Sequence, residues 1–289
     1  VSDSILDALE KLKKRQDIDC SQMLNIIHQT RTEASLKNQY RNASNISARI
    51  QLHTRFSKNK KGWFTWIYER LNLRDGMNIL EVGCGDGALW KGLNIPEKIS
   101  LTLTDISEGM IRDVRKVFGE DRKYLRLLSC DCQAVPFEDN TFDLVVANHV
   151  LFYCGDVEKA CREIYRVLKP GGRVIAATYG KHHMEEINRL VLGFDERIVL
   201  SSQCLYERFG KENGGSILEK MFKEVCWEEY EDSLCVNEPE PLISYILSCH
   251  GNQNEYIIDC YNEFKDYVKK KMQPFFYITK EAGIFSGKK

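Results

Sequence analysis

Hydrophobic residues between positions 77 and 178 follow two alternating spacings. Short apolar runs predict five β-strands, at residues 77–82, 99–104, 124–129, 142–147 and 172–178. Apolar residues at helical spacing predict helices near residues 87–93, 108–118 and 156–168. Strands that alternate with helices in this way are typical of an α/β fold with a parallel sheet.

The segments on either side have a different pattern. Helical spacing at residues 3–15, 20–40, 46–57 and 62–72 predicts an N-terminal helical cap over residues 1–75. Residues 76–289 form the second predicted domain. After the alternating part it has helical stretches at about 181–221 and 239–271, an extended stretch at 223–236 and a closing edge strand at 283–289. Gly214 and Gly215 predict a break in the first helical stretch.

Polar residues indicate which strands lie in the middle of the sheet. Residues 79–82 and 144–147 are apolar on both faces, which favours central positions. Arg126 interrupts the third run, which favours an edge position. The strand order then reverses between the first and fourth strands, and open α/β sheets bind ligands at such a point.

The first strand leads into a glycine-rich turn. Glu81 is followed by Gly83, Gly85 and Gly87, and glycine suits a sharp turn because it adopts positive φ readily. Asp105 ends the second apolar run and Asp131 follows the third. Strand ends that carry glycines or an acid predict a nucleoside site at one edge of the sheet.

The glycine spacing alone also fits a nicotinamide dinucleotide. Gly83, Gly85 and Ala88 satisfy the pattern G-x-G-x-x-A. Two features argue against that reading. Glu81 is expected to point into the ligand site, and Asp86 places negative charge where a pyrophosphate would lie.

Composition narrows the function classes. The formal charge of −1 over 289 residues provides no general attraction for nucleic acid or an anionic membrane. The 11 cysteines lack paired zinc-type spacing, so we expect no metal and a reducing compartment. No apolar stretch approaches the roughly 20 residues of a membrane span, and the first residues show no signal-peptide core. We therefore expect a cytoplasmic protein without membrane partners.

From about residue 63 to residue 179, these motifs resemble those of the class I S-adenosylmethionine-dependent methyltransferases, in particular the small-molecule group that includes quinone-biosynthesis enzymes. The resemblance implies S-adenosylmethionine as cofactor and S-adenosylhomocysteine as product. It also implies the cofactor-binding residues: Glu81, Gly83, Cys84 and Gly85 in the glycine loop, Asp105 at the ribose, Ile106, Asp131 and Cys132 at the adenine, and Asn148 at the end of the fourth strand beside the sulfonium.

The resemblance further implies a Rossmann-like seven-stranded sheet in the order 3-2-1-4-5-7-6, with the last strand antiparallel, an N-terminal helical cap and helical insertions after strands 5 and 6. It leaves the acceptor open, because the regions that select it in this family lie outside the matching part. One departure is informative. The branch that methylates amides or nucleic-acid amines has Asn/Asp-Pro-Pro-Tyr/Phe after the fourth strand, whereas this chain has Asn148 followed by His149.

Four residues after strands 4 and 5 are candidates for catalysis. His149 is expected beside the sulfonium, and histidine titrates near neutrality, so it is a candidate general base. Tyr179, His182 and His183 follow the fifth strand at the same edge and are candidates for contacting the acceptor. Their structural alternatives are a wall residue with one hydrogen bond for His149 and an exposed helix start for the other three.

Residues 51–66 are also rich in functional groups. Arg55, or else His53, is a candidate for binding the cofactor carboxylate, because arginine forms bidentate pairs. Trp63 and Trp66 are candidate walls of the methionine site. The alternative is that both tryptophans pack the helix onto the sheet, while the lysines at 58, 60 and 61 are solvated.

The leading hypothesis is in-line methyl transfer to a small-molecule acceptor with an O, N or C nucleophile. Correct positioning can supply about 7–11 kcal/mol of such a barrier. One alternative is a tRNA or rRNA methyltransferase, which the basic run at residues 55–61 supports. Another is a cofactor-binding scaffold that transfers no methyl group. The sequence does not define an oligomeric state.

Overall fold

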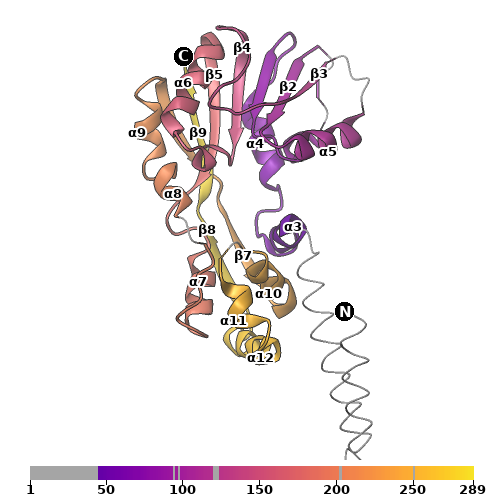
Figure 1. The fold of residues 1–289 in the computed structure, drawn as a ribbon, viewed down its shortest axis with the longest axis vertical. Helices are drawn as coiled ribbons and strands as arrows, with labels where there is room; N and C mark the ends of the chain where they lie inside the picture. The colour runs from indigo at the N-terminus through magenta and orange to yellow at the C-terminus, as the bar shows by residue number, and fades with distance from the viewer. Residues whose placement is uncertain (1–44, 94, 97, 120–123, 202–203, 250) are drawn as a thin grey trace, which may run out of the picture.

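The computed structural model describes residues 45–93, 95–96, 98–119, 124–201, 204–249 and 251–289. The helices expected at 3–15 and 20–40 lie outside these residues. Figure 1 shows two parts: a sheet with helices on both faces, and a smaller part, the helical lobe, at one end of the sheet.

The sheet has seven strands in the order β3-β2-β1-β4-β5-β9-β6. Their bounds are Asn78–Val82 (β1), Ser100–Asp105 (β2), Leu125–Ser129 (β3), Phe142–Asn148 (β4), Leu168–Tyr179 (β5), Lys223–Glu229 (β6) and Ala282–Lys288 (β9). Strand β9, the last along the chain, is antiparallel to both neighbours. This confirms the fold class, the strand order, the central positions of β1 and β4, and the edge position of β3.

The closing strand is not at an edge, so that expectation was wrong. Strand β6 pairs with the outer side of β9, and Ile284 and Phe285 of β9 are buried. The short apolar run after residue 282 is therefore an interior strand, with its side chains covered on both faces.

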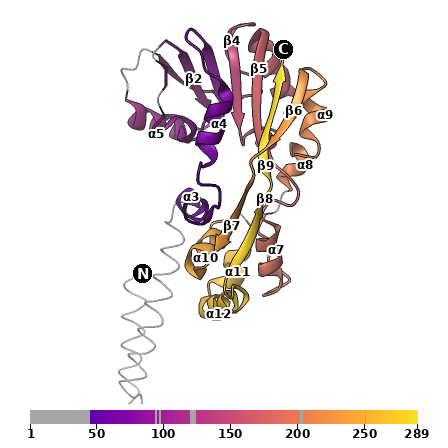
Figure 2. The same ribbon diagram turned by 180° about the vertical axis from the view of Figure 1, so that it is seen from behind.

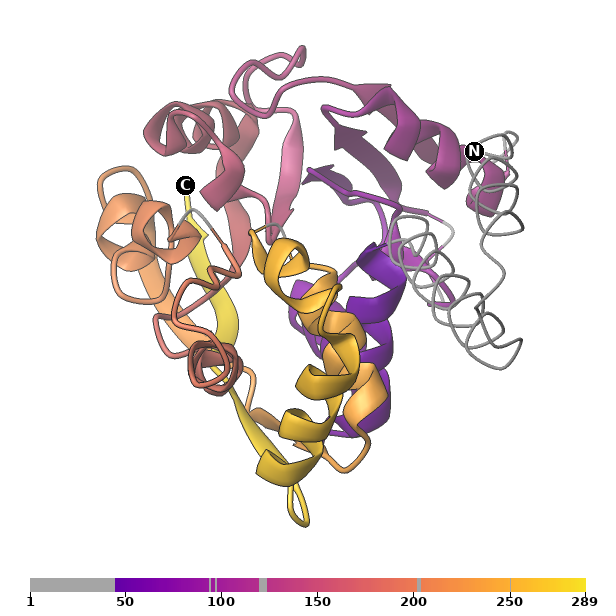
Figure 3. The same cartoon turned by 60° about the horizontal axis from the view of Figure 1, so that its bottom comes forward.

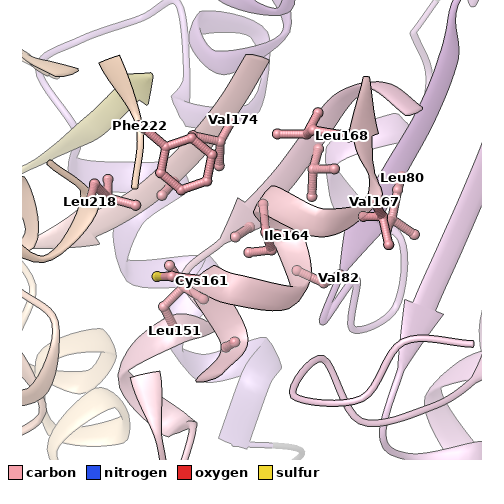
Figure 4. Close-up of a cluster of buried hydrophobic side chains, with 14 of the residues drawn as sticks. Leu80, Val82, Leu151, Cys161, Ile164, Val167, Leu168, Val174, Leu218 and Phe222 are labelled. Carbon is pink, nitrogen blue, oxygen red and sulfur yellow. The ribbon is translucent and has the colours of Figure 1, made fainter. Parts of the chain in front are cut away.

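Helices cover both faces of the sheet. Side chains alternate between faces along a strand, so Leu80 and Val82 of β1 point to one face and Ile79 to the other. The first face packs against α6 (Val157–Val167), α9 (Gly214–Leu218) and the turn η2 (Leu151–Tyr153), as Figure 4 shows for part of the cluster. The second packs against α4 (Trp63–Leu71), α5 (Glu108–Phe118) and the turn η1 (Ala88–Trp90).

Most of the helices predicted for this part are present, with two differences. The helices expected at 62–72, 108–118 and 156–168 correspond to α4, α5 and α6. The helix expected at 87–93 is only the single turn η1, because Gly87 and Gly92 on either side of it have positive φ values of 75° and 70°. Gly214 and Gly215 do not break a helix but begin α9, where Gly214 packs closely against the ring of Phe285.

The helical lobe has its own hydrophobic core. Its members are α3 (Asn45–Phe56), α7 (Glu185–Leu192), α10 (Pro239–Leu247), α11 (Gln253–Ile257), α12 (Tyr261–Lys271) and an antiparallel ribbon of β7 (Asp232–Val236) and β8 (Phe276–Lys280). Leu52, Leu234, Ile243, Phe264 and Ile278 are buried together at its centre. Helix α3 thus belongs to this lobe, whereas α4 belongs to the sheet. The ribbon was not predicted from the sequence, which indicated one extended stretch at 223–236.

Two of the connections between the sheet and the helical lobe run from strand to strand. Strand β6 continues into β7, and β8 continues into β9 through Glu281 (Figure 2). Tyr179 at the carboxyl end of β5 pairs with Ala282 at the start of β9. The lobe therefore lies at the carboxyl ends of the parallel strands, as Figure 3 shows with this end turned toward the viewer. The short helix α8 (Leu205–Arg208) lies beside η2.

Candidate functional site

The glycine loop after β1 has the geometry of a ligand cradle. Gly83, Gly85 and Gly87 have φ values of 65°, 55° and 75°. A Cβ on Gly83 would lie 2.2 Å from Cγ2 of Val150, so the backbone there packs directly against the segment after β4. A Cβ on Gly85 would have no atom within 4 Å. The backbone at Gly85 therefore borders open space that a ligand can occupy.

Glu81 does not point into this space, contrary to the expectation from the sequence. Its side chain is 1% exposed, and Oε2 accepts a hydrogen bond of 2.6 Å from the indole N–H of Trp90. Burial raises the pKa of Glu81 from 4.5 to about 8, and the negative charges of Asp105 and Asp86 act in the same direction. Glu81 thus holds the turn η1 against the strand, and its burial favours the protonated form.

The two acids after β2 and β3 lie at neighbouring strand ends. The backbone N–H groups of Gly85 and Ser107 donate to the two oxygens of Asp105, at 2.9 and 2.8 Å. Each carboxylate oxygen has a second lone pair, so Asp105 can still accept two hydroxyl groups. Asp131 accepts from the backbone N–H of Gln133 at 2.8 Å. Strand pairing brings the segments together, because the N–H of Cys130 donates to the carbonyl of Asp105.

Two neighbours of these acids have distinct environments. Ile106 is 73% exposed beside Asp105, an apolar surface suited to a flat ring. The Sγ atom of Cys132, next to Asp131, lies 3.2 Å from Sγ of Cys154. Cys84 in the glycine loop is buried, and burial raises the pKa of its thiol. The ten cysteines within the described residues are all thiols.

An aromatic row crosses the ends of β4 and β5. It runs through Trp63, His149, Tyr179 and His183, with ring centroids separated in turn by 4.9, 6.3 and 5.2 Å. The indole N–H of Trp63 also donates to Oδ1 of Asn148 at 3.3 Å. Trp63 therefore attaches α4 to the end of β4, next to the residue that the resemblance places beside the sulfonium.

His149 lies in an unusual backbone conformation. Its φ is 54°, a left-handed value that few residues other than glycine adopt, and it is held there by a bond from its N–H to the carbonyl of Ala177. Burial and the positive charge of Lys280 lower the pKa of His149 from 6.5 to about 4. The imidazole is therefore neutral at physiological pH and has a lone pair available.

His183 is fixed by a second backbone contact. Its Nδ1 accepts from the N–H of Glu281 at 3.2 Å, so in the neutral ring the proton is on Nε2. Burial lowers the pKa of His183 well below its ordinary value, and the nearby groups His53, His149 and Lys280 act in the same direction. His183 is therefore a neutral hydrogen-bond donor.

Two cavities meet at this histidine. The first has a volume of about 470 Å³ and is lined by Trp63, His149, His183, Tyr230 and Lys280 together with residues of α3. The second has about 520 Å³ and lies between Tyr179, His183, α7 and the segment that follows α7. Both volumes are in the range of small-molecule sites. The first cavity contains both Trp63 and His149, the residues nearest the end of β4.

Two candidates from the sequence lie away from these cavities. Arg55 forms an exposed ion pair of 2.6 Å with Glu238, so its guanidinium is engaged with the start of α10. His182 is exposed and pairs with Glu185 of α7. Neither lines either cavity, whereas His53, the alternative to Arg55, lines the first. Trp66 is buried against the sheet and stacks on Trp63.

Sequence reasoning missed three residues at the first cavity: Tyr230 and Lys280 line it, and Asp232 is the ion-pair partner of Lys280. Tyr230, Asp232 and Lys280 come from β6–β7 and β8, far from the glycine loop in sequence. No motif surrounds them. Only the pairing of Asp232 opposite Lys280 in the ribbon could have indicated them, and that register follows from the tertiary structure.

The residues present fit a nucleoside cofactor. The open space at Gly85, the acceptor oxygens of Asp105 and Asp131 and the exposed Ile106 provide a backbone cradle, hydroxyl and amine acceptors, and an apolar ring surface. Among the described residues there is no group of three or more His, Cys, Asp or Glu side chains placed to hold a metal ion. Nor does any described helix have the length and apolar character needed to cross a membrane.

Comparison with known families supports this geometry. Residues 80–176, which include the glycine loop, both acids and His149, match a family model described as a methyltransferase domain. The chain is 33% identical over 110 residues to the sterol 4-C-methyltransferase strm-1 of Caenorhabditis elegans. This alignment covers 38% of this chain and 33% of that protein. The chain is also 30% identical over 135 residues to the ubiquinone/menaquinone biosynthesis C-methyltransferase UbiE of Escherichia coli. This alignment covers 44% of this chain and 52% of that protein. The chain thus spans only a third to a half of these curated relatives.

Solved structures extend the fold match beyond this stretch. The superposition on the YcgJ protein of Bacillus subtilis covers 78% of this chain and 97% of YcgJ, with a TM-score of 0.53 and 16% sequence identity. The superposition on the [4+2]-cyclase SpnF covers 78% of this chain and 79% of SpnF, with a TM-score of 0.50 and 20% sequence identity. Likeness at this level shows the fold alone. The family match identifies residues 80–176 as a methyltransferase domain, and its relatives and cofactor are those of S-adenosylmethionine-dependent methyltransferases.

Proposed function

We propose that this protein transfers a methyl group from S-adenosylmethionine to a small-molecule acceptor bound in the first cavity. The observation that carries the proposal is the position of Trp63 and His149. Trp63 is bonded to Asn148 at the end of β4, and both Trp63 and His149 line the cavity. The wall of the acceptor cavity is thus continuous with the end of the strand that borders the cofactor site.

On this proposal, each residue of the cofactor site would hold a particular part of S-adenosylmethionine. The backbone around Gly83, Cys84 and Gly85 would hold the methionine part, and Asp105 the ribose hydroxyls. Ile106, Asp131 and the N–H of Cys132 would hold the adenine. When bound, S-adenosylmethionine supplies an electrophilic methyl group on a sulfonium.

The protein contributes mainly by positioning, because in-line displacement needs donor and acceptor held in near-attack geometry. Trp63 and Tyr230 provide flat apolar walls for the acceptor. His183 donates its Nε2–H to an acceptor oxygen or nitrogen. His149, neutral at physiological pH, takes the proton that the acceptor loses. Because a pKa of about 4 makes it a weak base, its contribution lies at the low end of the range of about 10²–10⁴ in rate.

The helical lobe closes the acceptor site on this proposal. Helix α3 lines the first cavity and α7 the second, and both pack on the core of the lobe. We therefore retain the division into an N-terminal helical cap and a larger domain with acceptor-covering helices, with α3 as part of the cover. We also propose a cytoplasmic location, because the number and spacing of the cysteines in the sequence suit a reducing compartment.

Binding measurements test this function first. Calorimetric titration with S-adenosylmethionine, S-adenosylhomocysteine and NAD(H) should give micromolar binding of the first two compounds and none of the third. Binding of NAD(H) alone would contradict the proposal. Transfer from radiolabelled cofactor to a panel of small acceptors then tests turnover, and tight cofactor binding with no turnover on any acceptor would favour a scaffold.

Methylation of RNA has less support. In the basic run, Arg55 and Lys61 are paired with Glu238 and Glu69, and Lys60 bonds to the carbonyl of Ser57. Much of the positive charge is therefore already engaged. A gel-shift assay with tRNA at increasing salt should show no specific complex, and a salt-sensitive complex of high affinity would reverse this conclusion.

A further inference from the structure

Lys280 lines the first cavity and forms a buried ion pair with Asp232, which does not line it. Asp232 and Lys280 are opposite each other in the β7–β8 ribbon, with Nζ 2.8 Å from Oδ2. Their side chains are 0% and 8% exposed, so both charges are removed from bulk water. Burying two charges costs desolvation free energy that their attraction often does not recover, and apolar side chains would pair the strands at least as well. Stability of the ribbon alone therefore does not explain the pair.

Asp232 is shared among several donors. Oδ1 accepts from the N–H groups of Asn59 at 2.9 Å and Ser233 at 2.8 Å, and Oδ2 also accepts from the hydroxyl of Ser57 at 2.6 Å. An ammonium group has three N–H donors, of which the bond to Asp232 uses one. Lys280 therefore keeps donor capacity for a ligand.

The charge of Lys280 acts inside the cavity. Lys280 lines the cavity together with His149 and His183, and its positive charge contributes to the lowered pKa of both. Both imidazoles are neutral near pH 7. Of the ion pair, only Lys280 lines the cavity, so the wall presents its ammonium group and not the carboxylate of Asp232. Trp63 and Tyr230 provide apolar surface around Lys280. A largely apolar cavity with one buried cation favours a ligand with an apolar body and one negative group.

We propose that Lys280 binds an anionic oxygen, a carboxylate or an ionised hydroxyl, on an otherwise apolar acceptor in the first cavity. The proposal rests on the proposed function and deepens it, because it names the class of acceptor. A neutral molecule of the same shape binds more weakly, because charge-assisted hydrogen bonds are stronger than neutral ones. Lys280 is then a specificity-determining residue that does not fix the methylated atom.

Paired probes of similar shape, one anionic and one neutral, test this inference on the full chain saturated with S-adenosylhomocysteine. The carboxylate arm compares 2-naphthoate with 2-naphthamide by calorimetry. The hydroxyl arm compares 4-nitrophenol, at an alkaline pH where it is ionised, with 4-nitroanisole. We expect the anion to bind at least tenfold more tightly in one arm, and that arm identifies the acidic group. Equal affinities within both pairs would overturn the proposal.

Variants assign the preference to Lys280. The double variant K280M/D232N removes the ion pair without leaving one charge buried alone, and it should bind anion and neutral probe within twofold of each other. K60M is the matched control, because Lys60 also lines the cavity but is exposed. It should retain the preference of the wild type. Loss of preference in K60M but not in the double variant would overturn the assignment.

Circular dichroism and the affinity for S-adenosylhomocysteine report whether the double variant is folded. If it is not folded, K280R replaces it. K280R preserves the positive charge and should retain the preference for the anion. The proposed function is tested separately by cofactor binding. Anion preference without cofactor binding would contradict the methyltransferase function alone, whereas cofactor binding without anion preference would contradict only the role of Lys280.

Discussion

The indole of Trp63 lies on the imidazole of His149, with ring centroids 4.9 Å apart and an interplanar angle of 29°. The stack joins α4 to the end of β4, and the bond from Trp63 to Asn148, the last residue of β4, holds it there. It holds a histidine with a left-handed backbone in one orientation at the wall of the first cavity.

Replacement of His149 by alanine should separate proton transfer from cofactor binding. Affinity for S-adenosylhomocysteine should stay within about threefold, because His149 makes no assigned cofactor contact. Turnover should fall by an amount at the low end of about 10²–10⁴ if the imidazole accepts a proton. In the wild type, kcat/KM should rise with pH through about 4 and then stay level as the ring becomes neutral. Unchanged turnover in H149A would make the residue a wall of the cavity only.

Two glycine substitutions should have different consequences. G83A places a Cβ 2.2 Å from Val150 at positive φ, so it should lower the free energy of unfolding by about 2–5 kcal/mol, from backbone strain and overpacking together. G85A meets no atom within 4 Å, so it should cost only about 1–2 kcal/mol while its methyl group obstructs the cofactor. Urea denaturation and cofactor titration check both. Equal losses of stability would contradict the packing difference.

Loss of the Asp105 carboxylate should weaken cofactor binding. D105A removes the acceptor assigned to the ribose hydroxyls and the brace on the N–H of Gly85. Hydrogen bonds to a charged group contribute about 1.5–3 kcal/mol, so affinity for S-adenosylmethionine should fall ten- to a hundredfold or more. D113A is the control, since Asp113 forms a surface ion pair with Lys116 on α5. Equal affinity in D105A and wild type, measured by calorimetry, would remove the ribose assignment.

Burial of Glu81 should make stability depend on pH. Its pKa is about 8 in the folded protein and 4.5 when exposed, so between these values the folded state binds more protons than the unfolded state. The contribution of Glu81 protonation to the free energy of unfolding is fully present below pH 4.5. It is lost as the pH rises toward 8, by up to about 1.4 kcal/mol per pH unit.

The variant E81Q checks this effect, because its amide oxygen can keep the bond to Trp90 without a titrating group. Thermal unfolding should show that E81Q gains stability relative to the wild type as the pH increases from 5 to 8. The exposed-residue variant E69Q should show no such trend. A difference between E81Q and the wild type that is the same at every pH would show that Glu81 does not titrate anomalously.

Local patterns in the sequence were sufficient for the sheet. The apolar run 79–82 and the polar interruption at Arg126 predicted which strands are central and which is at the edge, because burial on two faces requires apolar residues at every position. The positions of the glycine loop, Asp105 and Asp131 at neighbouring strand ends followed in the same way, since parallel strands bring their carboxyl ends to one edge of the sheet.

The tertiary structure decided what local patterns do not encode. Whether Glu81 faces a ligand or Trp90 depends on how η1 folds back over the strand, and the glycines on both sides of η1 allow more than one path. The wall of the first cavity combines Trp63, His149 and Lys280, which are separated by up to 217 residues in the chain (280 minus 63). Sequence spacing indicated the proposed cofactor site, which consecutive strand ends build. The first cavity, the proposed acceptor site, depends on long-range contacts between the helical lobe and the sheet, and only the folded chain brings those residues together.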